Sequence, residues 1–455
     1  MIFKAQSALT QQVELCSSFS QSTAFLHIFS VYRAQMSLKL VTPAEVQEMR
    51  FDPIDPVARE QASSILAEVK AKGSDGLIEV AVRLRDIEAK DSKIIFSRDD
   101  LKASFDQLDA KAQQILLRTA DRIKVFAEAQ RASINETTIS IPGGQAGHTI
   151  APMEVAGCYA PGGRYPLPSS VLMTAVTARA AGVRKVWVAS PRPALATLAA
   201  AYVANADGLL AIGGAQAIGA MAYGIGGIPA CDVIVGPGNK WVTAAKGLVS
   251  GICAIDMLAG PSEVLVIADE SCDPDTVAAD LLAQAEHDTE ARPILVCTSE
   301  KVANDVNKCV EQRLQVLPTG DVAKEAVKKG FACICPDIAT AIAVSDIVGP
   351  EHLEIHTVDP VSVSKQCSSY GAVFIGSISA EVLGDYGAGP NHVLPTCGTA
   401  RYTGGLSVFT FLRIRTWMNI TDKVSSQELI QDCVDLARIE GLEGHARAAE
   451  RRLIN

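Results

Sequence analysis

The amino-acid sequence predicts an α/β protein with two tandem Rossmann-like parallel-sheet domains and with helical N- and C-terminal extensions. From residue 151 to 249, short apolar runs end in glycine turns and are followed by helical stretches. The same alternation resumes from 264 to 376, whereas residues 43–135 and those after about 405 show helical patterns. Alternating strands, turns and helices are typical of a parallel sheet covered by helices on its faces.

The N-terminal segment, residues 1–36, differs from the rest of the chain. It is rich in Ser and Gln and contains one acidic residue, Glu14. This composition partly matches an organelle transit peptide, although the segment is not rich in Arg. We expect a disordered or targeting extension, with Met36 as an alternative start. The expected compartment is the cytosol, or a plastid if the segment is a transit peptide.

Helical patterns dominate the sequence that follows this extension. Residues 37–62 are expected to form an N-terminal helical segment, and a helix that begins at Pro56 is expected to stop near Gly73. Apolar residues at helical spacing predict a long amphipathic helix from 108 to 133.

The first α/β series contains four apolar runs with the length of buried strands, each followed by a helical stretch. The predicted strands are 155–159, 185–190, 209–212 and 232–235. The predicted helices are 169–180, 193–205, 215–223 and 241–249.

The second series follows a seam that we place near Gly260-Pro261-Ser262. Its predicted strands are 264–268, 293–297, 332–335 and 371–376. Its predicted helices are 273–287, 300–316 and 337–347, and two more helices are predicted at 426–439 and 442–453.

Charge and cysteine usage exclude several classes of protein. The net charge is −10 and no block of Lys and Arg dominates any stretch, which argues against nucleic acid or an anionic membrane as the main partner. No run of about 18 apolar residues marks a membrane span. The 12 cysteines include no C-x-x-C pair and several have apolar neighbours, which indicates reduced cysteines in an intracellular protein.

The glycine turns of the first series are candidate phosphate-binding sites. They follow predicted strands, at the edge of the sheet where open α/β sheets bind ligands, and the N–H groups of the next helix suit a pyrophosphate. However, Gly213-Gly214 and Gly236-Pro237-Gly238 do not match G-x-G-x-x-G. Nucleotide binding and plain turn chemistry therefore both remain open at this point.

The second series and the C-terminus contain most of the ionisable residues of interest. Gln284 and His287 are three residues apart on a predicted helix, so they are expected to project from one face and to bind one divalent metal. Each such pair is structural more often than not, because Asp and His are common at caps and turns. Several pairs together favour a metal or acid–base site. The other pairs are Glu351 with His352, Asp385 with His392, and Glu440 with His445.

Seven motifs, taken in order, resemble the histidinol dehydrogenase family over residues 37–455. The resemblance implies oxidation of L-histidinol to L-histidine through L-histidinal, with reduction of two NAD⁺, by a zinc-dependent homodimer in histidine biosynthesis. The motifs are Tyr159-Ala160-Pro161-Gly162-Gly163, Gly213-Gly214-Ala215-Gln216-Ala217-Ile218, Gly236-Pro237-Gly238-Asn239-Lys240, Ala259-Gly260-Pro261-Ser262-Glu263-Val264, Gln284-Ala285-Glu286-His287, Pro350-Glu351-His352-Leu353-Glu354, and Asp385-Tyr386 with Asn391-His392-Val393-Leu394-Pro395-Thr396.

The resemblance also implies a role for each matching residue. The expected acid–base residues are Glu351 and His352. The expected NAD contacts are Tyr159, Gln216 and Asn239. The expected zinc-site residues are Gln284, His287, Asp385 and, from the partner subunit, His445. The expected substrate contacts are Ser262, Gln284, His287, His352, Asp385, His392, Glu440 and His445.

The same resemblance assigns functions to the domains. We expect residues 63–136 and 262–402 to form an α/β catalytic domain and residues 137–261 to form an α/β NAD-binding domain. Residues 403–455 are expected to be a C-terminal helical segment that reaches the partner subunit.

Two alternatives belong to other classes of protein. One is a thiol-dependent aldehyde dehydrogenase with Cys231 or Cys253 as nucleophile, although the apolar neighbours of these cysteines offer no thiolate stabilisation. The other is a non-catalytic nucleotide-binding or metal-sensing protein, which would need no clustered acid–base pairs.

Overall fold

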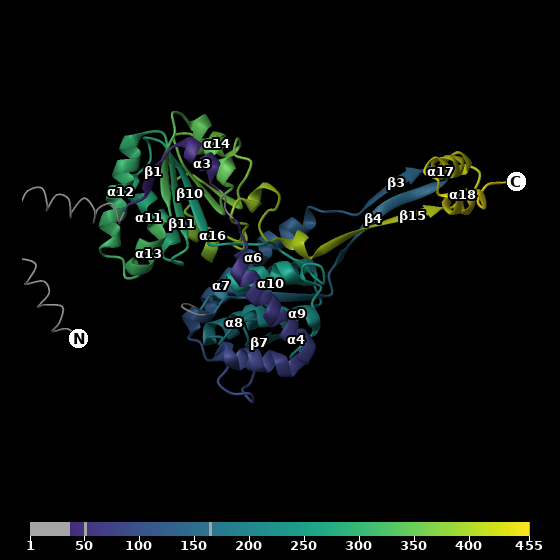
Figure 1. The fold of residues 1–455 in the computed structure, drawn as a ribbon, viewed down its shortest axis with the longest axis horizontal. Coiled ribbons are helices and arrows are strands. Elements are labelled where there is room, and N and C mark those ends of the chain that lie inside the picture. Colours follow the sequence, from purple (N-terminus) through teal and green to yellow (C-terminus); the bar gives the residue numbers. More distant parts are fainter. Residues whose placement is uncertain (1–36, 50–51, 163–165, 455) are drawn as a thin grey trace, which may run out of the picture. The chain divides into compact units, whose positions relative to one another are not determined.

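The computed structural model describes residues 37–49, 52–162 and 166–454. The expected extension, residues 1–36, lies outside the described residues. The chain forms two compact units, which are coloured by sequence in Figure 1. The first unit contains the described residues up to 55 together with 257–383 and 394–405. The second contains the described residues of 56–256, 384–393 and 406–454.

The first unit is built on a six-stranded sheet with the order β1-β12-β11-β10-β13-β14. All of its strand pairs are parallel, as predicted for a doubly wound α/β domain. Its strands are β1 (Lys39–Val41), β10 (Glu263–Ala268), β11 (Arg292–Cys297), β12 (Phe331–Ile334), β13 (His352–His356) and β14 (Ala372–Ile375).

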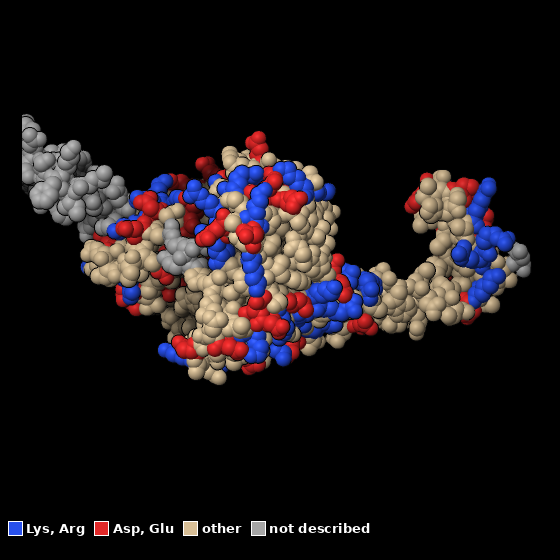
Figure 2. Space-filling model, turned by 90° about the horizontal axis from the view of Figure 1, so that it is seen from below, with Lys and Arg blue, Asp and Glu red and all other residues tan. Residues whose placement is uncertain are grey.

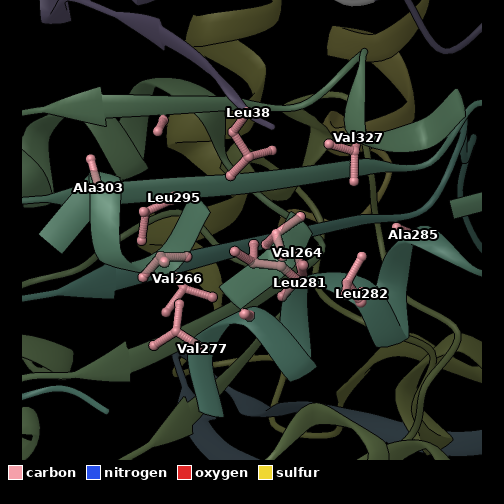
Figure 3. Packing of buried hydrophobic residues seen from close by; sticks show 14 of the residues in the cluster. Leu38, Val264, Val266, Val277, Leu281, Leu282, Ala285, Leu295, Ala303 and Val327 are labelled. Carbon is pink, nitrogen blue, oxygen red and sulfur yellow. The ribbon is translucent and has the colours of Figure 1, made fainter. Parts of the chain in front are cut away.

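Helices cover both faces of this sheet, and each face has its own apolar core. Figure 3 shows the core between the strands and α11, where Val264 and Val266 pack with Val277 and Leu281, all four fully buried. Each such side chain contributes about 1.5–3 kcal/mol to folding. The helices are α3 (Pro43–Glu48), α11 (Pro274–Ala285), α12 (Glu300–Leu314), α13 (Gly320–Val327), α14 (Ile338–Val348) and α15 (Pro360–Ser364), with a 3₁₀ turn at Thr399–Arg401.

Strand β13, which sequence reasoning missed, carries polar residues on one buried face. His352, Glu354 and His356 alternate with Leu353 and Ile355, and all five residues are buried. In the parallel register, these three polar residues pair with the β10 residues that face α11. Because successive side chains of a strand point to opposite faces, the three polar side chains also face the α11 side of the sheet.

The second unit contains a six-stranded sheet with the order β2-β7-β6-β5-β8-β9. The edge strand β2 is antiparallel to β7, and the other pairs are parallel. The strands are β2 (Ile95–Ser97), β5 (Val155–Tyr159), β6 (Lys185–Ala189), β7 (Gly208–Leu210), β8 (Val233–Val235) and β9 (Ala254–Ile255).

Seven helices of the second unit pack around this sheet. The predicted stop near Gly73 is found as a kink, because Gly73 has a φ of 61° within α4. The helices are α4 (Pro56–Arg83), α5 (Arg98–Asp106), α6 (Ala110–Ala132), α7 (Pro168–Ala181), α8 (Leu195–Val203), α9 (Gly214–Tyr223) and α10 (Lys240–Val249). A short helix, α16 (Glu381–Tyr386), lies where the chain passes from the first unit to the second.

Residues 63–136 lie in a different unit from the one that we expected. We expected them to share a domain with 262–402, but they lie in the second unit. The physical reason is packing, because α4 contacts α9 and α10, α5 contacts α8, and α6 contacts α7. These helices therefore cover the sheet that contains β5.

The prediction of helical structure throughout 403–455 was wrong in part. Strand β15 (Leu412–Ile420) pairs along its whole length with β4 (Gly144–Pro152), and β4 also pairs with β3 (Thr137–Ile141). Figure 1 shows these strands as a long antiparallel ribbon that ends at α17 (Gln427–Ile439) and α18 (Glu443–Glu450). A 3₁₀ turn, Val408–Phe411, precedes β15.

The surface agrees with the charge pattern of the sequence. Lys and Arg are interspersed with Asp and Glu over the face shown in Figure 2. Among the described residues, no helix has the length and apolar character needed to cross a membrane.

Candidate active site

Helix α11 supplies the first predicted metal residue. Asp273 caps the helix by accepting a hydrogen bond from the Asp275 N–H at 3.3 Å, and Pro274 occupies the first turn, as expected. Gln284 is buried, at 1% exposure. His287, however, lies beyond the last helical residue and is exposed. The helix therefore ends earlier than the predicted 273–287, and the expectation that both residues project from one face stays a prediction.

His352 is held in a defined tautomer. Its Nδ1 lies 3.0 Å from the Glu263 carbonyl oxygen and 3.0 Å from Gln284 Oε1. Both partners are acceptors, so Nδ1 carries the proton and donates. The lone pair of the neutral ring is then on Nε2, which is the atom able to accept a proton from a substrate.

Two carboxylates lie close to this imidazole. Glu351 Oε2 is 3.8 Å from His352 Nδ1, and Glu381 Oε1 is 3.7 Å from the same atom. Glu351 Oε2 also accepts a hydrogen bond of 2.9 Å from the Glu263 N–H. The negative charges stabilise the imidazolium that forms when His352 accepts a proton. Glu351 and His352, which we predicted as an acid–base pair, therefore lie close together, and their roles stay a prediction.

Behind Glu351 lies a buried ion pair that sequence reasoning did not identify. Arg292 Nη1 is 3.0 Å from Glu263 Oε1, and Glu263 is 1% exposed. Burial raises the pKa of the Glu263 carboxyl to about 7, although the charge of the nearby Arg292 acts to lower this pKa. Because both the N–H and the carbonyl of Glu263 bind the acid–base pair, this ion pair supports the position of both residues.

A second polar cluster adjoins this pair on β13 and α11. His356 Nε2 lies 3.5 Å from Glu354 Oε2 and 3.8 Å from Asp280 Oδ2. Glu354 also accepts a hydrogen bond of 2.8 Å from the Glu381 N–H. Burial, and then the nearby Glu354, raises the pKa of Asp280 to about 7. A protonated Asp280 carboxyl reduces the repulsion between like charges in this cluster.

A possible metal position in the first unit involves His287. His287 and Glu381 offer an imidazole nitrogen and a carboxylate oxygen within 4.8 Å of each other. With the amide of Gln284, these donors have the chemistry that zinc accepts. Glu381 was absent from the predicted site, because its sequence neighbours carry no recognisable motif.

In the second unit, Asp385 and His392 are brought together. His392 Nδ1 donates to the Asp385 carbonyl at 3.1 Å, and the Ser170 hydroxyl lies 3.4 Å from His392 Nε2. Asp385 Oδ1 is 3.8 Å from His392 Nδ1. The Asp385 carboxylate is mostly buried, at 8% residue exposure. Backbone and side-chain contacts thus fix the orientation of the His392 ring.

Glu440 and His445 share a surface pocket of about 280 Å³ between α17 and α18. Both residues are exposed. Only Val434, Ala437 and Ala446 form the small apolar core between the two helices, with Ala449 against it. The last predicted residue, Ser262, directly precedes β10, and its carbonyl accepts the Arg292 N–H at 2.9 Å.

Two of the three residues expected to contact NAD, Tyr159 and Gln216, lie at the first turn of α9. The Tyr159 hydroxyl accepts a hydrogen bond of 3.1 Å from the Gly214 N–H. Asp86 Oδ2 accepts hydrogen bonds from the Gly213 N–H at 3.1 Å and from Gln216 Nε2 at 2.6 Å. These contacts occupy N–H groups that we expected to be offered to a pyrophosphate. Asp86 was missed because its stretch resembles a charged connector.

The other NAD candidate, Asn239, caps α10 with its side-chain oxygen. Asn239 Oδ1 accepts from the Trp241 and Val242 N–H groups at 3.1 and 3.2 Å. The turn before it depends on Gly236, which has a φ of 118° and whose Cβ would lie 2.0 Å from the Tyr159 carbonyl oxygen. Only glycine suits this turn.

A cofactor fits the α9 turn for a separate reason. Gln216 is 1% exposed, and its Oε1 is buried with no hydrogen-bond partner among the described residues. A Cβ on Gly214, whose φ is 64°, would lie 2.8 Å from this oxygen. A buried amide oxygen beside a glycine is a position where a ligand can donate a hydrogen bond.

The thiol alternative is not supported by the environment of the cysteines. Cys231 and Cys253 are both buried, and burial raises the pKa of each thiol, that of Cys253 to about 11. A thiol that stays protonated is a poor nucleophile.

Comparisons with known proteins identify the family of the chain. A family model described as "Histidinol dehydrogenase" matches residues 52–453. Histidinol dehydrogenase from Thermus thermophilus is 41% identical over 88% of this chain and 95% of its own length. The enzyme from Methanococcus maripaludis is 41% identical over 86% of this chain and 92% of its own length.

A solved structure shows the same fold. The crystal structure of histidinol dehydrogenase from Elizabethkingia anophelis matches with a TM-score of 0.84 and 31% identity, over 91% of this chain and 98% of that chain. The chain belongs to the histidinol dehydrogenase family and is an oxidoreductase.

Proposed function

We propose that this protein catalyses the zinc-dependent, NAD-linked four-electron oxidation of L-histidinol to L-histidine through L-histidinal. The single observation that carries the proposal is the tautomer of His352, whose Nδ1 is bound by two acceptors while Nε2 holds the lone pair. This is a base prepared to take a proton from an alcohol. Membership of the family supplies the expected substrate.

The cofactors fit the residues that are present. Tyr159, Gln216 and Asn239 would hold NAD, which accepts a hydride in each oxidation. Gln284, His287, Asp385 and His445 would hold zinc, which orients a substrate that carries an imidazole and an amine. The proposed substrate contacts also include Ser262, His392 and Glu440.

In the first oxidation, His352 Nε2 accepts the hydroxyl proton of the alcohol as the hydride leaves its carbon. The charge that develops on the ring is stabilised by Glu351 and Glu381, which lie 3.8 and 3.7 Å from Nδ1. The hydrogen bonds of Nδ1 to Glu263 and Gln284 keep the ring in place during this transfer. The product is the aldehyde.

In the second oxidation, water must add to the aldehyde. Glu351 accepts a proton from this water, and the hydrate then loses a second hydride to give the carboxylate. The hydrogen bond from the Glu263 N–H holds one oxygen of Glu351 and orients the other. Keeping the aldehyde bound between the steps avoids release of a reactive intermediate.

We further propose a homodimer in which each site takes His445 from the partner subunit. In support, β15 and α17 carry exposed apolar side chains that a second copy could cover. These include Ile414, Met418, Leu436 and Ile439. The proposed compartment is the cytosol, which agrees with relatives from bacteria and an archaeon.

The decisive experiment measures NADH formed from purified protein, L-histidinol and NAD⁺. We expect two NADH for each histidinol consumed, loss of activity after treatment with a metal chelator, and recovery with Zn²⁺. Thiol alkylation should leave the activity in place. No NADH with histidinol, or one NADH with the aldehyde as final product, would contradict the proposal.

Two variants test the assigned roles. Glu351→Gln should spare oxidation of the alcohol and block oxidation of the aldehyde, so that the yield falls to one NADH. Equal loss in both half-reactions would count against a water-activating role. His287→Asn should lower the zinc content of the purified protein, and unchanged metal stoichiometry would remove His287 from the site.

A further inference from the structure

Asp86 occupies a rigid position at the end of α4. Arg85 has a φ of 61°, which is rare for a residue other than glycine. The Asp86 N–H then reaches back to the Ala81 carbonyl at 2.8 Å, which is the hydrogen bond of a Schellman motif. This strained C-terminal turn sets the direction of the Asp86 side chain, and strain of this kind is concentrated at functional sites.

The Asp86 carboxylate is directed at the cofactor residues by two hydrogen bonds. Gln216 Nε2 donates to Asp86 Oδ2 at 2.6 Å, and the Gly213 N–H donates to the same oxygen at 3.1 Å. Because the Gln216 amide nitrogen binds Asp86, its Oε1 is turned to the other side, where it is buried without a hydrogen-bond partner. Asp86 therefore sets the orientation of a predicted NAD contact.

The topology indicates which end of a dinucleotide would lie here. The order β7-β6-β5-β8-β9 reverses direction between β5 and β8, and open α/β sheets bind dinucleotides across such a switch point. In the Rossmann arrangement, the adenosine half lies on the side of the second and third strands, which correspond to β6 and β7. The α9 turn follows β7, so Asp86 lies on the adenosine side, whereas Asn239 follows β8.

We propose that Asp86 makes this site select NAD⁺ over NADP⁺. The inference rests on the proposed NAD-linked function and adds the residue that determines the cofactor. A carboxylate has about four lone-pair positions, and the two hydrogen bonds use two of them on Oδ2. The carboxylate can accept hydrogen bonds from the ribose hydroxyls of NAD⁺. The 2′-phosphate of NADP⁺ would bring a second negative charge to the same place and be repelled.

The test is calorimetric titration of the purified dimer with NAD⁺ and with NADP⁺, without substrate. Wild-type protein should bind NAD⁺ at least about tenfold more tightly, because adjacent like charges disfavour the phosphate. Asp86→Asn keeps an oxygen for Gln216 and Gly213 but removes the charge. It should reduce the ratio of the two dissociation constants by roughly tenfold. The matched control is Glu88→Gln, an exposed residue on the same connector, which should leave the ratio unchanged.

Each outcome decides the inference. An unchanged ratio in Asp86→Asn, or equal affinities for both cofactors in the wild type, would overturn it. If the Asp86→Asn variant does not fold, the ratio of the two dissociation constants of the wild-type protein still tests the preference for NAD⁺. Equal binding of both cofactors by an enzyme that still oxidises histidinol refutes only the role of Asp86. Absence of binding to either cofactor refutes the NAD-linked function as well.

Discussion

Among the described residues, each unit contains a buried ion pair between a Lys or Arg and a carboxylate, but the two pairs contact different groups. In the first unit, Arg292 and Glu263 have side-chain exposures of 15% and 1%, and the backbone of Glu263 binds Glu351 and His352. In the second unit, Lys246 and Asp256 are 4% and 0% exposed. Their partner is the backbone of Gly236, whose N–H donates to Asp256 at 2.7 Å and whose carbonyl accepts from Lys246 at 2.9 Å.

The groups that the two ion pairs contact differ in whether they can titrate. The buried polar groups of the first unit include several carboxyls and imidazoles, among them the side chains that we propose gain and lose protons. The second unit fixes a glycine turn and helix caps, whose N–H and carbonyl groups do not titrate. We therefore expect variants of the Arg292–Glu263 pair to change proton transfer and variants of the Lys246–Asp256 pair to change cofactor affinity.

The largest effect is expected for His352→Gln, which removes the proposed base. Loss of a general base typically lowers the rate by about 10²–10⁴-fold, and both half-reactions should be affected. Stopped-flow measurement of NADH from histidinol and from histidinal checks this, together with the dissociation constant for NAD⁺. That constant should stay unchanged, because no NAD contact is proposed for His352.

A control for this variant is His148→Gln on β4, where Nε2 lies 3.1 Å from the Asn135 carbonyl. It should retain the wild-type rates. A His352 variant with full activity on either substrate would break the assignment of chemistry to the first unit.

Arg292→Met should cause the next largest effect by leaving Glu263 buried without its main cation. Breaking a buried ion pair costs about 3–5 kcal/mol in the free energy of unfolding. Urea denaturation measures this loss. The control is Arg313→Met, because Arg313 pairs with Asp275 at an exposed site, where a loss below about 1 kcal/mol is expected. Equal losses in the two variants would mean that burial of Glu263 does not determine the cost.

Lys246→Met tests the corresponding pair in the second unit. Asp256 keeps its hydrogen bond from the Gly236 N–H, so the loss of unfolding free energy should be nearer about 3 kcal/mol. Under conditions where the variant is folded, its dissociation constant for NAD⁺ should rise more than its rate at saturating NAD⁺ falls. A lower saturated rate with unchanged NAD⁺ affinity would reverse the contrast between the units.

The fold was predictable where the pattern is local. The apolar runs that became β5, β6, β10 and β11 are continuous and bounded by turns, so their strands were found at nearly the correct bounds. The packing of α4 and α6 on the second unit depends on contacts between distant residues, which periodicity does not contain. Strand β15 does show period-2 alternation, as in Leu412-Arg413-Ile414-Arg415, so this miss was avoidable.

Candidate site residues could be predicted where they belong to a recognisable sequence motif. Glu351 and His352 were singled out by their motif, but the strand that begins at His352 was not predicted, because charged residues at alternate positions normally indicate a solvent-facing side. Here that side faces α11. Glu263, Arg292 and Asp86 act through the backbone or through another side chain, and such partners become visible only when the chain is folded.

The smallest expected effect concerns the raised pKa of Asp280. Burial raises the pKa of Asp280 to about 7 from its usual 3.8, so between these values the folded state holds a proton that the unfolded chain has lost. Stability therefore falls as the pH rises through this window. Asp280→Asn removes this contribution, and the difference in unfolding free energy between pH 5 and pH 8 should shrink by about 2 kcal/mol.

Thermal denaturation across this pH range measures the effect. Part of the slope should persist, because the pKa of Glu263 is also raised to about 7 and contributes with the same sign. The control is Asp321→Asn, a fully exposed residue whose pH profile should match the wild type. Parallel profiles for Asp280→Asn and wild type would show that Asp280 is ionised in the folded protein.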